Sequence, residues 1–415
     1  MPVLVSTTAW RTAARLGEIV RAKRLSPRMR HSWSQVYRLV LSGGRLCLQT
    51  TDGRLSWILC AEMDRPQQEF DVLVSAREFD GLRWPKEWDG VEIEHDAALN
   101  LLTIRRGLMV LRMTADPSHT YPKQQDESSK LAQATDERHP DRAKAVRWMI
   151  DARTLFESLE FVSPLVARPR FGAETSVVAY LPGGRLVGGT PLVFGTVEGL
   201  PSPPTVMSYS RPSAEVLAAF LAELGGAVQV EISKPFHRFT CPNVGHELHL
   251  LSKDGAPPPW PQPDDEDYEE ILIDRRSFTR DALIARVCLP KHADRLEVLI
   301  RGDAENASLR LSTPDFDGAG TPGSFGTRGS FYLRDVIRDV RPLIHRPGEE
   351  REAPDSRFSV LADHLCTALE RMKGETLRLV YYGRLTLLRI DDAAEGPGET
   401  KRSAFLSIRE HVGRE

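Results

Sequence analysis

The sequence predicts an α+β fold of three domains, each with two halves in which a helix lies on antiparallel strands. Two patterns indicate this. Amphipathic helix segments recur at intervals of roughly 60 to 85 residues, and each is followed by the apolar alternation that is typical of strands. The length of 415 residues also exceeds what one hydrophobic core usually holds. We therefore expect one supersecondary unit to be used six times.

The predicted helices share one design. Each has apolar residues at i, i+3 and i+4 spacing, as Leu155, Phe156 and Leu159 do, so that one stripe can be buried on a sheet. The opposite face is basic on five helices, whereas the fourth carries Glu215 and Glu223. The six helices are predicted over Thr7–Lys23, Ser75–Trp84, Ala152–Val162, Ser213–Leu224, Arg276–Val287 and Ala362–Met372.

Alternating strands follow each helix. Tyr37–Thr51 alternates apolar and polar residues around Ser-Gly-Gly, which is typical of a hairpin. Strict alternation implies antiparallel strands with one buried face, on which the helices can pack. The other strand segments are Val91–Met113, Ser176–Thr190, Ala227–Leu251, Arg295–Leu311 and Leu377–Ile390.

Two polar stretches divide the chain into domains. Residues 116–145 contain few apolar residues and read as an exposed linker. Residues 253–270 contain Pro-Pro-Pro-Trp-Pro-Gln-Pro followed by Asp-Asp-Glu-Asp, which favours an extended spacer. The predicted domains are residues 1–120, 145–255 and 270–415.

Composition narrows the classes of function. The net charge of −3 means that nucleic-acid binding would depend on where positive charge is placed rather than on its total. The five cysteines are odd in number and widely spaced, which favours free thiols over disulfides. The sequence has neither a long apolar run nor a signal-peptide pattern, so we expect a soluble, cytoplasmic protein with no membrane partner.

No pattern in the sequence indicates an enzyme. Residues 318–323 match a GxGxxG string, but a proline interrupts it and no apolar helix follows, so we expect a flexible loop. Four potential zinc ligands lie on predicted strands: His237, Cys241, His246 and His249. Their spacing matches no common zinc site. We expect no catalytic residue, metal or cofactor.

Three segments are similar to a known family: VLVSTTAWRTAARLGEIV near the start, LCLQTTDGRLSWIL after the first hairpin, and FSVLADHLCTALERMKGETLRLVYY near the end. Together with the three-domain pattern, they resemble the bacterial DNA polymerase III beta subunit, the sliding clamp. The resemblance covers nearly the whole chain in architecture. It implies the DNA clamp fold, with outer sheets and inner helices.

The resemblance also implies a function. Two chains would join head to tail as a ring-shaped homodimer around double-stranded DNA, independently of its sequence. The ring would tether DNA polymerase or another DNA-processing enzyme as a processivity factor, with a clamp loader as a possible further partner. The alternative is a scaffold or adaptor with the clamp fold, in a phage, plasmid or defence context, that does not slide on DNA.

Basic residues on or just after the helices are the predicted DNA contacts. A common basic surface would attract phosphates without reading bases, although a basic stripe on any one helix is also compatible with a merely solvated face. Arg24 falls where the clamp family has a DNA-contacting basic residue, just after the first helix. The predicted contacts are Arg11, Arg15, Arg24, Arg77, Arg83, Arg153, Arg276, Arg280, Arg371 and Lys373.

The resemblance further implies a groove for partner peptides between the second and third domains. Gly189–Phe194 and Ala404–Val412 stand roughly where the family has its groove-forming segments, although their residues differ from the family's pattern. The predicted groove residues are Val193, Phe194, Leu406 and Ile408, which are also compatible with ordinary strand positions.

Closure of a ring requires an exposed strand edge at each end of the chain. In the third domain the candidate edges are Leu377–Ile390 and Ala404–Ile408. In the first domain the candidate is Val91–Arg112.

Overall fold

The computed structural model describes residues 3–6, 36–43, 45–51, 55–62, 68–80, 90–117, 145–166, 177–233, 236–243, 245–252, 268–289, 294–301, 308–312, 330–332, 337–341, 356–382, 386–392 and 400–410.

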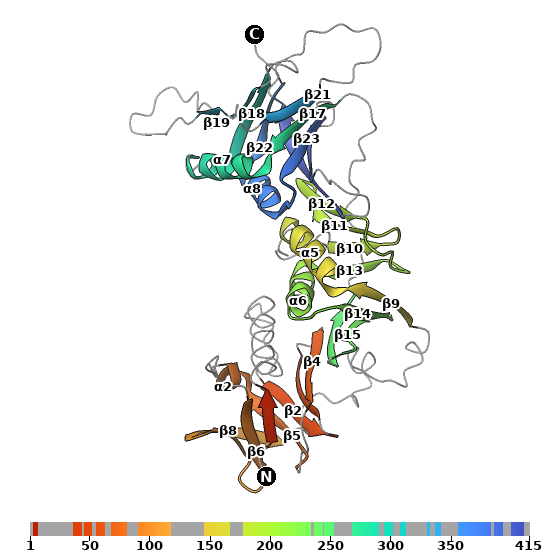
Figure 1. The fold of residues 1–415 in the computed structure, drawn as a ribbon, viewed down its shortest axis with the longest axis vertical. Coiled ribbons are helices and arrows are strands. Elements are labelled where there is room, and N and C mark those ends of the chain that lie inside the picture. The colour runs from red at the N-terminus through yellow and green to blue at the C-terminus, as the bar shows by residue number, and fades with distance from the viewer. Residues whose placement is uncertain are drawn as a thin grey trace. The chain divides into compact units, whose positions relative to one another are not determined.

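One order of elements recurs along the chain: a leading strand, a helix and three trailing strands (Figure 1). We call each repeat a module and number the modules 1 to 6 from the N-terminus. In module 1 the predicted helix Thr7–Lys23 lies outside the described residues. The leading strands are β1 (Val3–Ser6), β5 (Phe70–Ser75), β9 (Val146–Asp151), β13 (Met207–Ser210), β17 (Glu269–Asp274) and β22 (Ser356–Leu361). The helices of modules 2 to 6 are α2 (Ala76–Asp80), α5 (Ala152–Val162), α6 (Arg211–Ala222), α7 (Arg275–Val287) and α8 (Ala362–Arg371).

The trailing strands come in threes. Modules 1 to 3 contain β2 (Val36–Ser42), β3 (Arg45–Thr51) and β4 (Leu55–Glu62), then β6 (Gly90–Asp96), β7 (Leu101–Arg106) and β8 (Met109–Pro117), then β10 (Val177–Leu181), β11 (Arg185–Thr190) and β12 (Val193–Glu198). Modules 4 to 6 contain β14 (Ala227–Ile232), β15 (Phe236–Cys241) and β16 (His246–Leu251), then β18 (Arg295–Arg301), β19 (Ser308–Ser312) and β20 (Ser330–Tyr332), then β23 (Thr376–Tyr382), β24 (Leu387–Asp392) and β25 (Lys401–Glu410). Module 5 has one further strand, β21 (Ile337–Arg341), and a short 3-10 helix, η4 (Ser163–Leu165), follows α5.

The helices lie where the apolar periodicity predicts them, and α5 has the predicted bounds Ala152–Val162. Two helices begin at an aspartate that ends the leading strand. A carboxylate oxygen of Asp151 accepts a hydrogen bond from the Thr154 backbone N–H at 2.8 Å, and one of Asp274 accepts from the Ser277 N–H at 2.9 Å. These caps satisfy backbone donors that the first helical turn leaves without partners.

The described residues form two compact units. One comprises Met1–Glu157 with Pro212–Asp254, and the other Ser158–Arg211 with Gly255–Glu415. The sheet of the first unit has the strand order β1-β6-β7-β8-β5-β2-β3-β4-β16-β15-β14-β9. The sheet of the second unit follows β13-β10-β11-β12-β25-β22-β18-β19-β20, with β17, β21, β23 and β24 attached to it. Mixed helices and antiparallel sheets confirm the predicted α+β class, whereas the three-domain division stays a prediction.

Neighbouring modules exchange their leading strands. The leading strand of each module pairs with the first trailing strand of the other module in its pair: β1 with β6, β5 with β2, β9 with β14, β13 with β10, β17 with β23 and β22 with β18. Each exchange ties its two modules together, because each module receives a strand of its hydrogen-bonded ladder from the other.

The third trailing strands make a second kind of pairing. β4 of module 1 pairs antiparallel with β16 of module 4, and β12 of module 3 pairs antiparallel with β25 of module 6. Each pairing therefore joins modules that are three apart along the chain. Among the described residues, β8 of module 2 and β20 of module 5 lack a partner of this kind.

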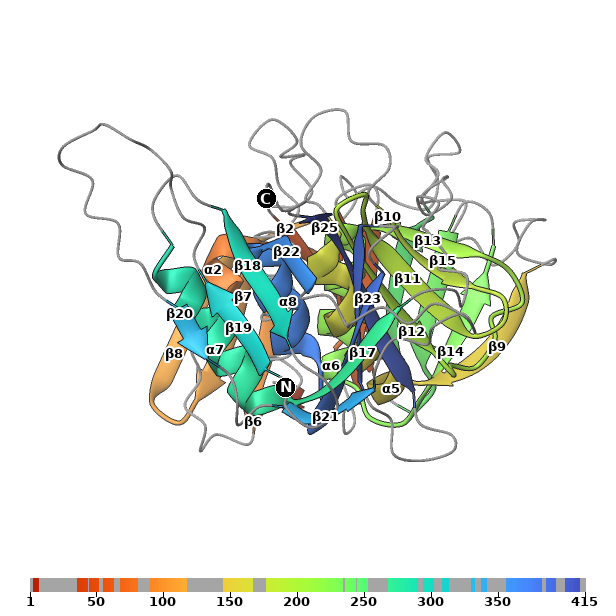
Figure 2. The same ribbon diagram turned by 90° about the horizontal axis from the view of Figure 1, so that it is seen from above.

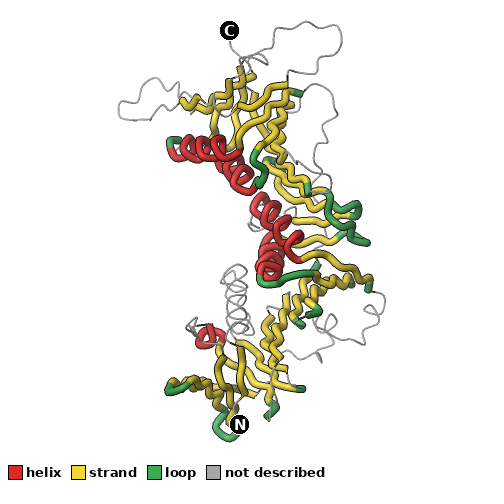
Figure 3. Tube along the Cα trace, in the orientation of Figure 1, coloured by secondary structure: helices red, strands yellow, loops and turns green. Residues whose placement is uncertain are grey.

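The helices cover one face of their sheets. In the second unit, α7 and α8 lie side by side (Figures 2 and 3). α7 contacts β17 and β19, and α8 contacts β22 and β25. Glycines allow two strands to approach α5 and η4 closely. A Cβ on Gly188 would stand 2.8 Å from a Val162 methyl carbon, and a Cβ on Gly195 would stand 2.5 Å from a Leu165 methyl carbon. These two glycines let β11 and β12 pack directly beneath α5 and η4.

Two segments predicted as exposed edges are interior to the sheet, so that prediction is wrong. Leu377–Ile390 and Ala404–Ile408 form parts of β23, β24 and β25, which have strand neighbours on both sides. Within Val91–Arg112, β6 and β7 are also flanked on both sides. Along Met109–Arg112, β8 has a neighbour on one side only within the described part of the chain. Apolar alternation identifies a strand but does not give its position in the sheet order.

No helix within the described ranges is both long enough and apolar enough to cross a membrane.

Candidate nucleic-acid interface

The described basic residues among the predicted DNA contacts are all exposed. They are Arg77 on α2, Arg153 on α5, Arg276 and Arg280 on α7, Arg371 at the end of α8, and Lys373 just beyond it. Each helix buries its apolar stripe, as α8 does with Leu365 and Leu369, so these side chains project from the opposite faces. The other predicted contacts, Arg11, Arg15, Arg24 and Arg83, lie outside the described residues.

Three of these arginines have carboxylate partners on the helices. Arg153 Nε lies 3.0 Å from Glu157 Oε1, one helical turn away, and Arg280 Nε lies 2.8 Å from Asp281 Oδ1. Arg371 Nη1 lies 4.0 Å from Glu160 Oε1, so this pair links α8 to α5. Carboxylates this close offset much of the field that a phosphate would experience.

A fourth arginine, which was not among the predicted contacts, links two helices. Arg286 Nε on α7 lies 2.7 Å from Asp363 Oδ1 on α8. The sequence shows the spacing of Arg153 and Glu157 directly, but Arg286 and Asp363 are brought together only by the packing of the two helices.

Val193, Phe194 and Leu406 lie at the junction of β12 and β25. Ile408 lies further along β25, opposite Val360 of β22, and all four predicted groove residues are buried. Val193 is directly opposite Leu406 in the antiparallel register, and Phe194 is opposite Phe405. Because strand side chains alternate between faces, Val193 shares the helix-covered face with Gly195, whereas Phe194 packs on the other face in a cluster that includes Phe405 and Tyr382.

Val193 and Phe194 therefore cannot line the same surface. The exposed apolar residue at this junction is Leu192, whose side chain is 47% exposed. Its carbonyl accepts a hydrogen bond from the Ser407 backbone N–H at 2.9 Å. Leu192 lies in the predicted segment Gly189–Phe194. Only the strand register distinguishes this exposed residue from its buried sequence neighbours, so the sequence alone did not identify it.

The arrangement of modules is similar to that of solved sliding clamps. The structure of the DNA polymerase III beta subunit from Thermotoga maritima matches with a TM-score of 0.74 at 12% identity, covering 99% of this chain and 100% of that one. The chain has the DNA clamp fold. Sliding clamps from Pseudomonas aeruginosa and Bacillus subtilis match over the same shares, with TM-scores of 0.73 and 0.72 at 13% and 15% identity. No protein-family model and no curated protein matches the sequence.

Positive charge is uneven on the helices of this clamp fold. α7 carries four arginines and one aspartate. On α5 one arginine stands with two glutamates, and on α8 one arginine stands with an aspartate and a glutamate. Of the helices described, α7 therefore has the most favourable field for phosphate, and Arg276 on it has no carboxylate within ion-pair distance among the described residues.

The histidines and the cysteine considered as zinc ligands do not converge. In the described part of the chain, no three His, Cys, Asp or Glu side chains form a group able to hold a metal ion. His237 lies in the interior, and burial lowers its pKa to about 4. Burial likewise lowers the pKa of His246 to about 4. Both imidazoles are therefore neutral at physiological pH and serve as core or half-buried strand residues.

Proposed function

We propose that this chain is a divergent sliding clamp, in which two copies close head to tail around duplex DNA and tether a polymerase or another DNA-processing enzyme. The observation that carries the proposal is the pairing of third trailing strands between modules three apart. Modules 1 and 4 pair in this way, as do modules 3 and 6. Continuing the series, module 5 would pair with module 2 of the next copy, so that β20 of one chain meets β8 of the other.

Side chains at both proposed edges support this closure. Leu108, which immediately precedes β8, is fully exposed. Met109 and Val110, the first two residues of β8, are 39% and 48% exposed. On α7, which contacts β19, Ile284 and Val287 are 43% and 84% exposed. Apolar side chains at both edges would be removed from water when the strands pair, which adds a hydrophobic contribution to the hydrogen-bonded ladder.

The helices of such a ring would face the DNA backbone. Contacts that neutralise phosphates need no particular base sequence, so the exposed arginines of α7 suit a protein that moves along any duplex. The two copies would supply two such helices. In this role the protein performs no chemistry of its own and works in the cytoplasm.

Clients would bind where β12 meets β25. Leu192 supplies an exposed apolar anchor there, as recognition of short peptides requires. The buried Val193, Phe194, Leu406 and Ile408 would support the site from beneath rather than line it. A loader that opens the β8–β20 junction would be needed to place a closed ring on circular DNA.

Retention on DNA of defined topology tests the proposal. Protein loaded on a closed circular plasmid should stay bound through gel filtration in high salt and should be lost after a single restriction cut. Loss from circular and linear DNA at equal rates would contradict the clamp.

A scaffold or adaptor with the clamp fold is the second candidate. The ion pairs of Arg153, Arg280 and Arg371 favour it, because they reduce the positive field on the helices. Such a protein would bind its client equally well in the presence and absence of DNA, and its retention would not depend on DNA topology.

A further inference from the structure

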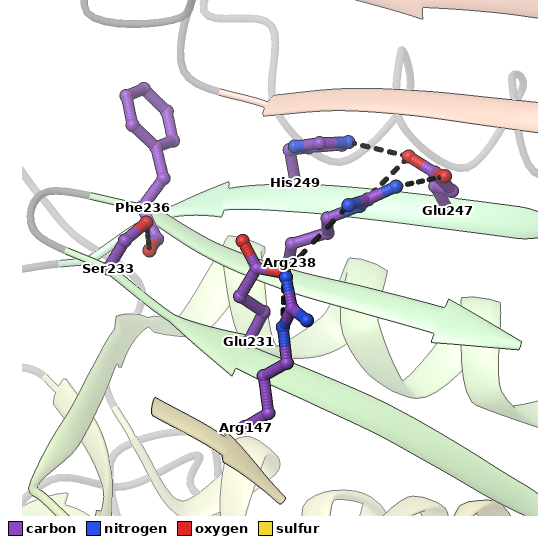
Figure 4. A network of polar contacts seen from close by, with 7 residues as sticks. All are labelled: Arg147, Glu231, Ser233, Phe236, Arg238, Glu247 and His249. Atoms are coloured by element: carbon purple, nitrogen blue, oxygen red, sulfur yellow. Dashed lines mark hydrogen bonds and ion pairs between the residues drawn. The ribbon is translucent and has the colours of Figure 1, made fainter. Parts of the chain in front are cut away.

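A row of alternating charge crosses one face of the first unit (Figure 4). In register, Arg147 on β9 lies opposite Glu231 on β14, which lies opposite Arg238 on β15, which lies opposite His249 on β16. Arg147 Nε donates to Glu231 Oε2 at 3.2 Å. Arg238 Nη1 lies 3.9 Å from the same Glu231 oxygen.

Glu247 completes the row at its inner end. Arg238 Nε donates to Glu247 Oε2 at 3.0 Å, and His249 Nε2 lies 3.1 Å from that oxygen. Burial alone would raise the pKa of Glu247, but hydrogen bonds and charge from His249 and Arg238 outweigh it and hold the pKa at about 2. The inner end of the row is thus fixed in its charged form at physiological pH.

The outer end of the row is open. The side chains of Glu231 and His249 are 6% and 2% exposed, whereas that of Arg147 is 61% exposed. Arg147 bonds to Glu231 through Nε, and within the described part of the chain neither of its Nη groups makes an ion pair. Continuing the alternation of charge would place a carboxylate beside Arg147.

This open end coincides with an open strand edge. β9 is the last strand in its sheet order and, within the described part of the chain, pairs with β14 only. Met149, which shares the face of Arg147, is 49% exposed, and Val146 is 43% exposed. An edge with free backbone groups and exposed apolar side chains is a template for another strand.

The equivalent edge in the second unit is filled. β17 pairs with β23 as β9 pairs with β14, and both strands end at an aspartate that caps the following helix. The other side of β17 is occupied by the antiparallel strand β21. Glu270 holds the position in β17 that Arg147 holds in β9, counted back from the final aspartate of each strand. In register, Glu270 lies opposite Arg341 of β21. The fold therefore accepts an added antiparallel strand at this edge, with a residue of opposite charge in register with Glu270.

We propose that the free edge of β9 binds an extended segment of a partner protein as an added antiparallel strand. The segment carries an aspartate or glutamate opposite Arg147 and an apolar residue opposite Met149. In antiparallel register, this apolar residue comes two positions before the acidic one. The site lies in the first unit and is distinct from the β12–β25 junction in the second.

Two labelled synthetic peptides test this proposal on the full chain by fluorescence polarisation. One contains Val-Thr-Glu between alternating threonines and valines, and the other has lysine in place of the glutamate. We expect saturable binding with a preference of about fivefold for the glutamate peptide, as cross-strand charge pairs allow. Arg147→Glu should reverse the preference, and Arg147→Gln, which introduces no repulsion with Glu231, should abolish it. Arg185→Glu, on β11 of the other unit, is the matched control and should leave it unchanged.

Hydrogen exchange locates the binding. Alternate amides of β9 donate to β14, and the others point to the open edge. The outward-pointing amides should exchange faster than those of β14 in the free protein and should become protected by the glutamate peptide. The proposal fails if neither peptide binds, or if Arg147→Glu leaves the preference intact. It also fails if the outward-pointing β9 amides are already protected in the free chain, because the edge is then filled by a second copy or by the chain itself.

Discussion

Truncating one residue on each side of the β12–β25 junction separates its structural part from its client-binding part. Leu406 is fully buried opposite Val193, whereas Leu192 nearby is 47% exposed. Leu406→Ala removes three carbons from a packed interior and leaves a cavity, which costs about 2–5 kcal/mol of unfolding free energy. Leu192→Ala should change that free energy by no more than about 0.5 kcal/mol.

Thermal unfolding followed by circular dichroism measures the difference. For a unit of this size, 1 kcal/mol corresponds to about 2–4 °C, so Leu406→Ala should lower the unfolding temperature by about 5–15 °C. Leu192→Ala should leave it unchanged. Binding of a client peptide should show the opposite order, with a loss for Leu192→Ala at a temperature where both variants are folded.

The result that would refute this reasoning is a stable Leu406→Ala variant that has lost peptide binding. Leu406 would then line a groove, as the sequence alone suggested, and the strand register would be wrong at this junction.

Three further predictions concern packing, pH and DNA. Gly195→Ala should lower the unfolding free energy by about 1–3 kcal/mol, because the added methyl group overpacks the space beneath η4. Gly225→Ala is the control, because a Cβ there meets no atom within 4 Å, and it should leave the unfolding free energy unchanged. Urea titration measures the unfolding free energy of both variants. Because burial lowers the pKa of His237 to about 4 from 6.5, the unfolded chain takes up its proton first. Stability should fall as pH drops from 6.5 toward 4, and His237→Gln should reduce that slope in urea titrations at several pH values. Arg276→Ala should reduce the slope of log affinity for DNA against log salt concentration by about one unit per copy. Arg153→Ala should reduce that slope less, because Arg153 is already paired with Glu157. Equal reductions for the two variants would contradict a leading role for α7.

Local patterns predict most of the elements. The i, i+3, i+4 spacing located the helices, and α5 has the predicted bounds because its apolar stripe and its aspartate cap agree. The leading strands were missed, although each is a short run before a helix, as in Phe70–Ser75. Runs of this length carry too little alternation to separate a strand from an ordinary loop.

Pairings between distant segments could not be predicted. Nothing local to Leu55–Glu62 shows that β4 pairs with β16, and nothing local to Arg371 shows that Glu160 on another helix lies beside it. The charge on a helix face is visible in sequence, but whether it is available to a ligand depends on neighbours that only the fold supplies. The same limit applies to the groove residues, because only the strand pairing shows that Val193 and Phe194 lie on opposite faces.

The mass of the protein in solution tests ring closure most directly. Light scattering after size-exclusion chromatography should give twice the chain mass of 46.5 kDa. Val287→Asp and Val110→Asp, which place a charge in the proposed contact from either side, should each give one chain mass, while Leu99→Asp, exposed in the turn between β6 and β7, should remain a dimer. A single chain mass for the unaltered protein across the concentration range, or dimers that are indifferent to both aspartates, would contradict closure through β8 and β20.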